Sequence, residues 1–510
     1  MAVTIYSGQV TGLQAQPISV EVDVSPGLHI FTIVGLADKE VQESRERISA
    51  AIRNTGALAP HKKSQRVIVN LAPANIRKEG PAFDLPVALG YLLASNQISF
   101  DPREKMFLGE LGLDGTLRKI SGVLPIALAA EICGFRQIIL PKGSGIEAAV
   151  LENIEIIEVE SLSEMIEYLS GVKTLSPLPK TEVNLEVVAG SLDFSDIKGQ
   201  EKAKRSLEIA AAGGHNILMY GPPGAGKTIL ARALPSILPK LTFAEALEVT
   251  KIYSVAGLLN EKQSFVSVRP FRSPHHTSSH VAIVGGGNYP RPGEITLAHR
   301  GVLFLDEFPE FDRRVLEALR QPLEERSVTI ARAMGVETFP AQFMLIAAMN
   351  PCPCGNYGNP LKECVCPPSV ASRYSKKISG PLLDRIDIHL NVPSQDFQNM
   401  ESQESPPSSE IRKRVEKARS RQRKRFSGLP IGTNAEMGLK EIKEFIRLDD
   451  YTKSVLRSAY QKYNLSARSY HKVLKLARTI ADLHEQDQIA SRDILEALQF
   501  RPQQEQGSNF

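Results

Sequence analysis

A glycine-rich stretch, Gly221-Pro-Pro-Gly-Ala-Gly-Lys-Thr228, constrains this chain more than any other feature. It has the pattern G-x-x-x-x-G-K-T and stands between an apolar run, 216–220, and a run with helical character, 228–234. Strand, loop and helix in that order form a phosphate-binding loop, because inward-turned backbone N–H groups and the positive end of the helix surround an anion. The stretch therefore predicts a nucleoside triphosphate site in an α/β domain.

Each residue of this loop has an expected part in holding ATP. The loop backbone surrounds the phosphates, the ammonium of Lys227 reaches the β- and γ-phosphates, and the hydroxyl of Thr228 binds Mg²⁺. The alternative is an ordinary Gly/Pro turn before a helix, and the complete pattern in this context favours the site. We expect ATP and Mg²⁺ as cofactors, held by Gly221, Pro222, Pro223, Gly224, Ala225, Gly226, Lys227 and Thr228.

Two later apolar runs end in polar side chains that suit the same site. The run 302–305 is followed by Asp306 and Glu307, and the run 343–349 is followed by Asn350. We expect Asp306 to hold Mg²⁺ through water and Glu307 to polarise the attacking water. Asn350 would orient that water or the γ-phosphate. The alternatives are a fortuitous acidic strand end and a turn-forming asparagine before a proline.

Two arginines complete a series that resembles the AAA+ ATPases. Arg385 lies between a short helix and a strand, where ring ATPases carry the arginine finger that enters the neighbouring subunit's site. Arg468, near the start of a later helix, is expected to touch the γ-phosphate from a helical lid. Either arginine alone is commonly a surface or ion-pair residue. The finger implies a homo-oligomeric ring, since one subunit cannot complete its own site.

Composition sets broad limits on the class of protein. Of 510 residues, 42% are hydrophobic and 23% are charged, which is ordinary for a soluble globular protein. We find no apolar run near the ~20 residues of a membrane span and no export signal. Five cysteines make no disulfide framework in so long a chain. We expect a cytoplasmic multidomain protein, and the net charge of +4 alone implies no nucleic-acid partner.

The first part of the chain alternates strand and helix patterns and resembles the proteolytic domain of Lon. The resemblance rests on Phe107–Val123 and on Lys78–Asp84. At the position of the Lon serine stands Ala82, and at the position of its lysine stands Ile132. Neither side chain can attack a carbonyl or accept a proton, so Ser–Lys proteolysis is excluded. We expect a Lon-like α/β fold that serves as a binding or assembly platform.

Further motifs extend the resemblance to nearly the whole chain. The stretches Arg272–Thr277, Gly285–Glu294 and Ala298–Glu307 resemble the magnesium-chelatase-like AAA+ family. Together with the Lon-like part, they resemble its YifB/ComM branch. That resemblance implies a hexameric DNA translocase or helicase that promotes branch migration of DNA junctions in recombination and natural transformation, binding single-stranded or branched DNA. Two alternatives are a chelatase-type ATPase that remodels a protein partner and an ATP-dependent protease, against which Ala82 and Ile132 argue.

These patterns divide the chain into successive parts. The expected order is a Lon-like domain at 1–172, a linker at 173–192, an AAA+ core with a four-cysteine insertion at 193–395, a linker at 396–409, a helical lid domain at 410–501 and a tail at 502–510.

Four of the five cysteines form two C-x-C pairs, Cys352/Cys354 and Cys364/Cys366. Four thiolates can hold Zn²⁺ tetrahedrally and stabilise a loop that has no core of its own. Structural zinc motifs more often use C-x-x-C, and the alternative is four reduced cysteines in a flexible insertion. We expect a zinc site here and a place in the core for Cys133.

The sequence does not decide the role of two further groups of side chains. Residues 410–425 carry nine Lys/Arg and two Glu, so this helical run is either a DNA contact or a solvated helix face. It lacks the interleaved aromatic residues of a base-stacking platform. His275, His276 and His280 lie in a Ser/Thr-rich stretch with no acidic residue nearby in sequence. We expect them to belong to an insertion that faces the ring pore, not to bind metal.

Overall fold

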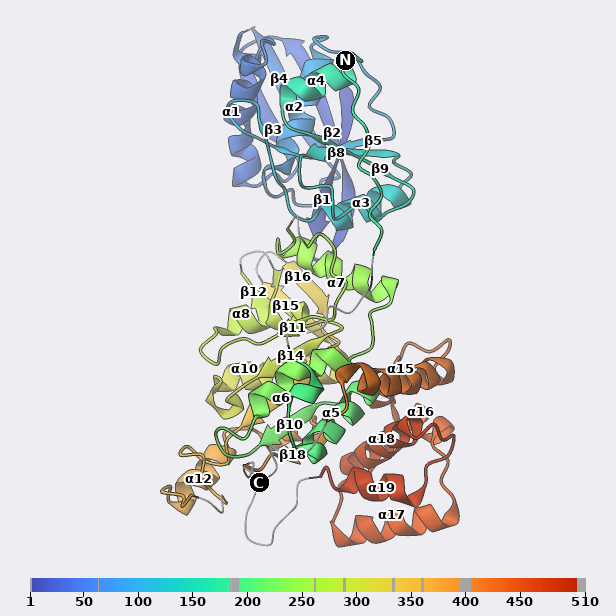
Figure 1. The fold of residues 1–510 in the computed structure, drawn as a ribbon. Helices are drawn as coiled ribbons and strands as arrows, with labels where there is room; N and C mark the ends of the chain where they lie inside the picture. The colour runs from blue at the N-terminus through green and yellow to red at the C-terminus, as the bar shows by residue number, and fades with distance from the viewer. Residues whose placement is uncertain are drawn as a thin grey trace. The chain divides into compact units, whose positions relative to one another are not determined.

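The computed structural model describes residues 2–62, 64–183, 185, 192–260, 263–287, 290–332, 335–358, 362–394 and 405–501. It forms two compact units, each of which has its own core (Figure 1). Unit 1 consists of Met1–Asn184 and Ala246–Val266, and unit 2 of Leu185–Glu245 and Ser267–Phe510. The expected tail at 502–510 lies outside the described residues, as do residues 184 and 186–191 of the first expected linker and 396–404 of the second. No helix in the described ranges is long and apolar enough to cross a membrane.

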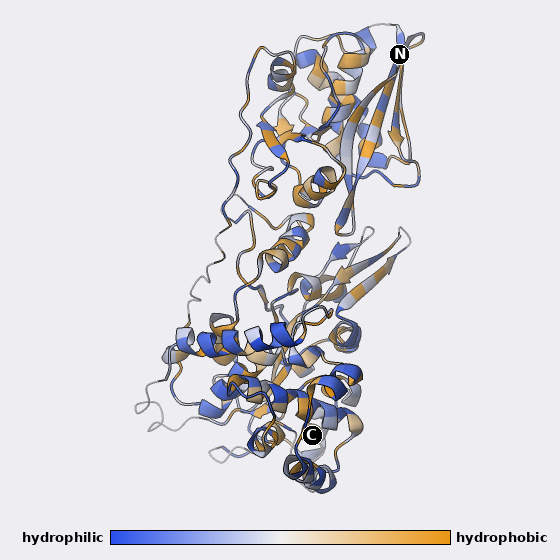
Figure 2. Ribbon diagram, turned by 90° about the vertical axis from the view of Figure 1, so that its right-hand side faces the viewer, coloured by the Kyte–Doolittle hydropathy of each residue, from blue (hydrophilic) through white to orange (hydrophobic). Residues whose placement is uncertain are grey.

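Unit 1 is built on a seven-stranded mixed sheet with the order β3-β4-β2-β1-β5-β8-β9. The long strand β2 alternates strictly, so that Ile18, Val20 and Val22 are fully buried while their neighbours face outward. Figure 2 shows this banding of hydrophobic and hydrophilic residues along the long strands. The strands are β1 (Val3–Thr11), β2 (Gln14–Pro26), β3 (Ile30–Val34), β4 (Gln65–Ala72), β5 (Lys105–Phe107), β8 (Gln137–Pro141) and β9 (Glu155–Val159).

The helices of unit 1 cover this sheet. Helix α1 begins where the Asp38 carboxylate accepts the Val41 N–H at 2.8 Å, and α2 is apolar almost throughout and buried. The remaining elements of unit 1 are a short β-pair and two further helices. Their bounds are α1 (Lys39–Asn54), α2 (Asp84–Ala94), β6 (Glu110–Leu111), β7 (Leu117–Arg118), α3 (Val123–Ile132) and α4 (Leu162–Leu169).

The positions that correspond to the Lon serine and lysine lie at the ends of elements in unit 1. Ala82 is half-buried just before α2, and Ile132, the last residue of α3, is 84% exposed. Cys133 follows directly and is also exposed, so the expectation that it lies in the core is wrong. The last buried residue of α3 is Ala130, so the end of the helix and Cys133 lie outside the core.

A segment from the middle of the chain, Ala246–Val266, belongs to unit 1 although its sequence position lies in the expected nucleotide domain. It includes most of α7 (Phe243–Val255). The hydroxyl of Ser254 donates to the Glu147 carboxylate at 3.0 Å, and the same carboxylate oxygen accepts the N–H groups of Val123 and Leu124 at the start of α3. Burial raises the pKa of Glu147 to about 7, against the effect of these three donors.

Unit 2 contains a five-stranded parallel sheet with the order β11-β14-β17-β10-β18. Its three central strands are short, apolar and almost entirely buried, as expected for a parallel sheet covered on both faces. Because all strands run in one direction, the residues that follow them meet at one edge. The strands are β10 (Ile217–Tyr220), β11 (Phe271–Arg272), β14 (Val302–Leu305), β17 (Met344–Met349) and β18 (Ile388–Asn391).

Short helices and strand pairs surround this sheet (Figure 1). They are α5 (Glu201–Gly213), α6 (Lys227–Ala233), α8 (His280–Val284), β12 (Gly285–Gly286), β13 (Arg291–Pro292), α9 (Glu294–Leu297), α10 (Arg313–Ala318), α11 (Arg320–Glu325), β15 (Ser327–Arg332), β16 (Gly335–Pro340), α12 (Pro368–Ser375) and α13 (Gly380–Leu383).

The C-terminal region is helical, which confirms that part of the expected fold class. Helix α18 buries an apolar stripe that includes Val473, Leu476, Ala477 and Ile480 in the same core cluster as the sheet strands. The helices are α15 (Ser408–Arg425), α16 (Leu439–Phe445), α17 (Asp450–Lys462), α18 (Ala467–Leu483) and α19 (Ser491–Leu498).

The basic helix α15 packs on α5 and α18 within unit 2. Most of its cations are already used there: Arg414 pairs with Glu208 at 2.6 Å, and Arg425 pairs with Asp482. Hydrogen bonds or ion pairs of this kind are made by Arg412, Arg414, Lys417, Arg419, Arg421 and Arg425. The helix therefore connects α5 and α18 within unit 2, and its contact with DNA stays a prediction.

Candidate nucleotide-binding site

The glycine-rich loop connects β10 to α6 at the carboxyl edge of the sheet. Gly224 and Gly226 have φ values of +78° and +90°, and a Cβ at either position would meet no neighbouring atom. Backbone conformation, not space, therefore requires glycine at these two positions. At Gly221 the reason is a close approach, because a Cβ there would lie 2.1 Å from the Val392 carbonyl oxygen.

Three oxygen atoms hold the ammonium group of Lys227. Its Nζ donates to the carbonyls of Gly221 and Pro222 at 2.8 and 2.9 Å and to the Asn350 side-chain oxygen at 3.1 Å. Burial lowers the pKa of Lys227, and the charge of Asp306 opposes that shift. Gly221 and Pro222 thus act on Lys227 instead of lining the cavity. The loop and the asparagine after β17 are brought together, as the sequence predicts.

Two oxygen groups suited to Mg²⁺ lie side by side at this edge. The hydroxyl of Thr228 donates to Asp306 Oδ2 at 2.8 Å, and the backbone N–H of Glu307 donates to Oδ1 at 3.0 Å. A hydroxyl next to a carboxylate is the donor set that Mg²⁺ uses in phosphate sites, so the residues fit the ion. A cavity of about 330 Å³ opens here, lined by Pro223, Gly224, Ala225, Gly226, Lys227, Thr228, Ile229, Asp306, Glu307, Met349 and Asn350.

Glu307 has a partner that the sequence did not reveal. Its carboxylate Oε2 lies 3.0 Å from His276 Nδ1, although the two residues are far apart in the chain. No acidic residue lies near the histidines along the chain, but the fold brings Glu307 into contact with His276. Glu307 also adopts a left-handed backbone conformation with φ of +50°, which costs about 1 kcal/mol for a residue other than glycine.

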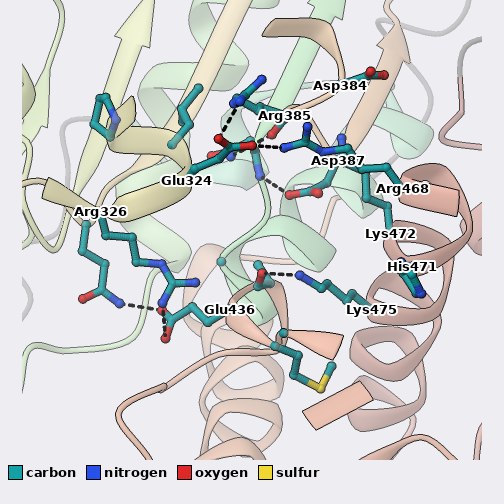
Figure 3. Close-up of a pocket in the computed structure, with 18 of the residues that line it drawn as sticks. Glu324, Arg326, Asp384, Arg385, Asp387, Glu436, Arg468, His471, Lys472 and Lys475 are labelled. Carbon is teal, nitrogen blue, oxygen red and sulfur yellow. Dashed lines mark hydrogen bonds and ion pairs between the residues drawn. The ribbon is translucent and has the colours of Figure 1, made fainter. Parts of the chain in front are cut away.

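Both predicted arginines contact one carboxylate, Glu324 on α11. The Arg385 Nη2 lies 2.6 Å from Glu324 Oε2, and Arg468 pairs with Oε1 of the same carboxylate. Figure 3 shows Glu324 between the two guanidinium groups. These ion pairs hold the pKa of Glu324 below its usual range, with the Arg385 hydrogen bond the largest cause. The structure thus brings the two arginines together.

The arginine pair lies in a different cavity from the glycine-rich loop. This second cavity measures about 410 Å³, and its lining includes Glu324, Arg385 and Arg468 but no residue of 221–228. The sequence-based expectation is that Arg468 touches the γ-phosphate from the helical lid. In the structure Arg468, near the start of α18, pairs with Glu324, and Lys472 on the same helix donates to the carbonyl of Ile386, the residue after Arg385.

The four clustered cysteines converge on one point. The Sγ–Sγ distances are 3.3 Å for Cys352–Cys354 and 3.6 Å for both Cys352–Cys364 and Cys354–Cys364, and all four ligand atoms lie within 4.8 Å of one another. Zn–S bonds of about 2.3 Å place tetrahedral sulfurs about 3.8 Å apart, so the cluster can hold a metal ion of that size. All four cysteines are free of disulfides.

The cysteine cluster also abuts the nucleotide loop. It begins just after Asn350, and a Cβ on Gly355 would lie 2.5 Å from Pro223 Cδ. The backbone of the cluster therefore approaches the glycine-rich loop too closely for any side chain at Gly355.

If the cluster binds zinc, substitution of a cysteine within it should change the zinc content of the protein, whereas substitution of Cys133 should not. Cys364→Ser should reduce the zinc content of the purified protein from about one ion per subunit to near zero, because three thiolates hold the ion much more weakly. The midpoint of thermal unfolding should fall as well. Zinc is measured by mass spectrometry, with Cys133→Ser as the matched control because Cys133 lies outside the cluster. Equal zinc content in the two variants would contradict the assignment.

The fold and the site define a P-loop protein of the AAA+ type. Family descriptions of the magnesium chelatase match three parts of the chain: subunit ChlI at residues 193–400, the Mg-chelatase subunit ChlI at 20–144, and the ChlI C-terminal part at 405–501. The competence protein ComM of Haemophilus influenzae is 42% identical over 506 residues, covering 98% of this chain and 97% of that protein. YifB of Escherichia coli is 41% identical over 502 residues, covering 98% and 96%.

The chain therefore belongs to the magnesium-chelatase family, in the branch that contains ComM and YifB. The predicted Lon resemblance is also found: Lon protease 2 of Bacillus subtilis is 29% identical over 146 residues, which are 28% of this chain and 26% of that protein. Membership of this family indicates ATPase activity with ATP and Mg²⁺.

Proposed function

We propose that this chain is a cytoplasmic ATP-driven motor that assembles into a homo-oligomeric ring, a hexamer, and moves on DNA. The ring is proposed because, within one subunit, the residues that would bind the phosphates and the arginines that would act on them lie in different cavities. Lys227, Thr228 and Asp306 share one cavity, whereas Arg385 and Arg468 lie in another. Lys227 and Mg²⁺ act on the bound phosphates, and an arginine that adds charge stabilisation during phosphoryl transfer would come from the neighbouring subunit.

The proposed roles follow from this division. Lys227 holds the β- and γ-phosphates, and its contact with Asn350 places that amide beside them. Thr228 and Asp306 hold Mg²⁺, which neutralises phosphate charge when bound. Glu307 polarises the attacking water, and Arg385 and Arg468 contact the γ-phosphate of the adjacent subunit. The division into Lon-like, nucleotide and lid domains is part of the same proposal, with the segment Ala246–Val266 packed in unit 1.

DNA is the proposed substrate, with branch migration of junctions as the activity. Support comes from the similarity to ComM, which is named a competence protein, and from 23% identity over 264 residues with the DNA replication licensing factor Mcm2 of Drosophila melanogaster. Helix α15 adds little support, because most of its cations pair within unit 2. A second candidate function is a motor that remodels a protein partner, and its support is the match to a chelatase subunit.

The rate of ATP hydrolysis with and without DNA distinguishes these functions. We expect single-stranded DNA and four-way-junction DNA to stimulate turnover several-fold, and the stimulation to fall steeply as salt rises, because phosphate contacts release counterions. The measurement is steady-state phosphate release by the full chain, with Lys227→Ala as the blank. Turnover that ignores every DNA at low salt would favour the protein-remodelling motor.

A further inference from the structure

The four-cysteine cluster and the glycine-rich loop are joined by a direct backbone contact. Gly355, which lies between the two cysteine pairs, is so close to the ring of Pro223 that an added Cβ would meet Cδ at 2.5 Å and Cγ at 3.0 Å. Gly355 is also buried and has a φ of +82°, so conformation and close approach both require glycine there. Pro223 itself lines the nucleotide cavity. The cluster therefore packs against the loop that would surround the phosphates.

The first half of the cluster is fixed beside the nucleotide cavity. Cys352 is fully buried and follows Asn350 by two residues, and the Asn350 side-chain oxygen accepts the Lys227 ammonium at 3.1 Å. The Sγ of Cys352 accepts the Tyr357 N–H at 3.3 Å, and its carbonyl accepts the Gly355 N–H at 3.0 Å. Burial and hydrogen bonds therefore hold this half of the cluster in place.

The second half of the cluster lies at the surface. All the residues of 362–366 other than Cys364 and Cys366 are exposed, and the described residues 350–358 and 362–367 form no helix or strand. An irregular exposed segment loses much conformational entropy when it is ordered, and a metal ion bound by its cysteines can supply the free energy that offsets this loss. A metal ion would therefore tie the exposed half of the cluster to the buried half and fix the backbone that contacts the glycine-rich loop.

We propose that zinc binding by the four cysteines and nucleotide binding by the glycine-rich loop strengthen each other through the contact of Gly355 with Pro223. With the ion bound, the backbone at Gly355 holds the Pro223 ring in the loop conformation of this structure. Without the ion, the segment that carries Cys364 and Cys366 is released, and the loop loses that support. Coupling between two sites is reciprocal, so each ligand raises the affinity for the other by the same factor. This inference is independent of whether DNA or a protein is the substrate of the motor.

The zinc affinity of the unaltered full chain tests the coupling directly. The protein is equilibrated with Zn²⁺ and a zinc-selective chelator of known affinity, with and without saturating ADP and Mg²⁺. Bound ADP should raise the zinc affinity about tenfold. Lys227→Ala is the matched control, because it keeps the four cysteines but loses the phosphate contact, so its response measures only direct chelation of zinc by ADP. Equal zinc affinity with and without ADP, an equal response in Lys227→Ala, or a protein that takes up no zinc would overturn the proposal.

Nucleotide affinity gives the reciprocal measurement. Cys364→Ser should weaken the binding of a fluorescent ADP analogue about tenfold, whereas Cys133→Ser, which lies outside the cluster, should leave it unchanged. Equal affinity in these two variants would overturn the coupling.

Pro223→Ala tests the route of the coupling and keeps all four cysteines. This variant should still bind about one zinc ion per subunit, but saturating ADP should change its zinc affinity less than about twofold, because the ring that Gly355 contacts is gone. Coupling that stays about tenfold in Pro223→Ala would overturn the assignment of the contact between Gly355 and Pro223 as the route.

Discussion

Replacement of Glu307 by glutamine is expected to lower ATP turnover by about 10²–10³-fold and to leave nucleotide binding nearly unchanged. The amide fits the same space but cannot polarise water as a carboxylate does. Lys227, Thr228 and Asp306 keep their contacts, so the phosphates and Mg²⁺ are still held. ATP should therefore accumulate uncleaved on the variant and trap an assembled ring.

Steady-state turnover, equilibrium binding of a fluorescent ATP analogue and size-exclusion chromatography measure the three parts of this expectation. Glu310→Gln is a suitable control, because Glu310 is near in the chain but pairs with Lys377 at 3.0 Å. Unchanged turnover in Glu307→Gln would remove Glu307 from its proposed role.

Mixing two inactive variants should restore ATP hydrolysis. Lys227→Ala keeps the arginines but loses the phosphate contact, and Arg385→Ala keeps the glycine-rich loop but loses the finger. The ATP turnover of each variant alone is expected to be at least 100-fold lower than that of the unaltered protein. In a ring formed from equal amounts of both, about a quarter of the interfaces combine an intact loop with an intact finger, so turnover should approach a quarter of the unaltered rate.

Matched pairs show which half of the site each residue belongs to. A mixture of Lys227→Ala and Glu307→Gln should stay inactive, because both changes affect the same cavity. If Arg468 acts with Arg385, then Arg468→Ala should recover with Lys227→Ala and stay inactive with Arg385→Ala. Recovery of Arg468→Ala with Arg385→Ala would instead return Arg468 to the site of its own subunit. No recovery in any mixture would rule out the shared site.

The local sequence determined the class of the protein and most of the residues that line the nucleotide cavity. The glycine-rich loop, the acidic strand end and the asparagine strand end each follow a short apolar strand, and parallel pairing brings such ends to one edge. The α/β fold, the helical C-terminal region and the family were predicted correctly for this reason. The four cysteines also needed little more than their spacing, because a short loop keeps its ligands close.

Tertiary structure alone decided the contacts between residues that lie far apart in the chain. The pairing of His276 with Glu307, the joint contact of Arg385 and Arg468 with Glu324, and the assignment of Ala246–Val266 to unit 1 all depend on which surfaces pack together. A charge pattern could not tell that α15 uses its cations internally, because carboxylates such as Glu208 and Asp482 come from other helices. Backbone patterns act over a few residues, whereas the partners of a side chain are set by the packing of whole elements.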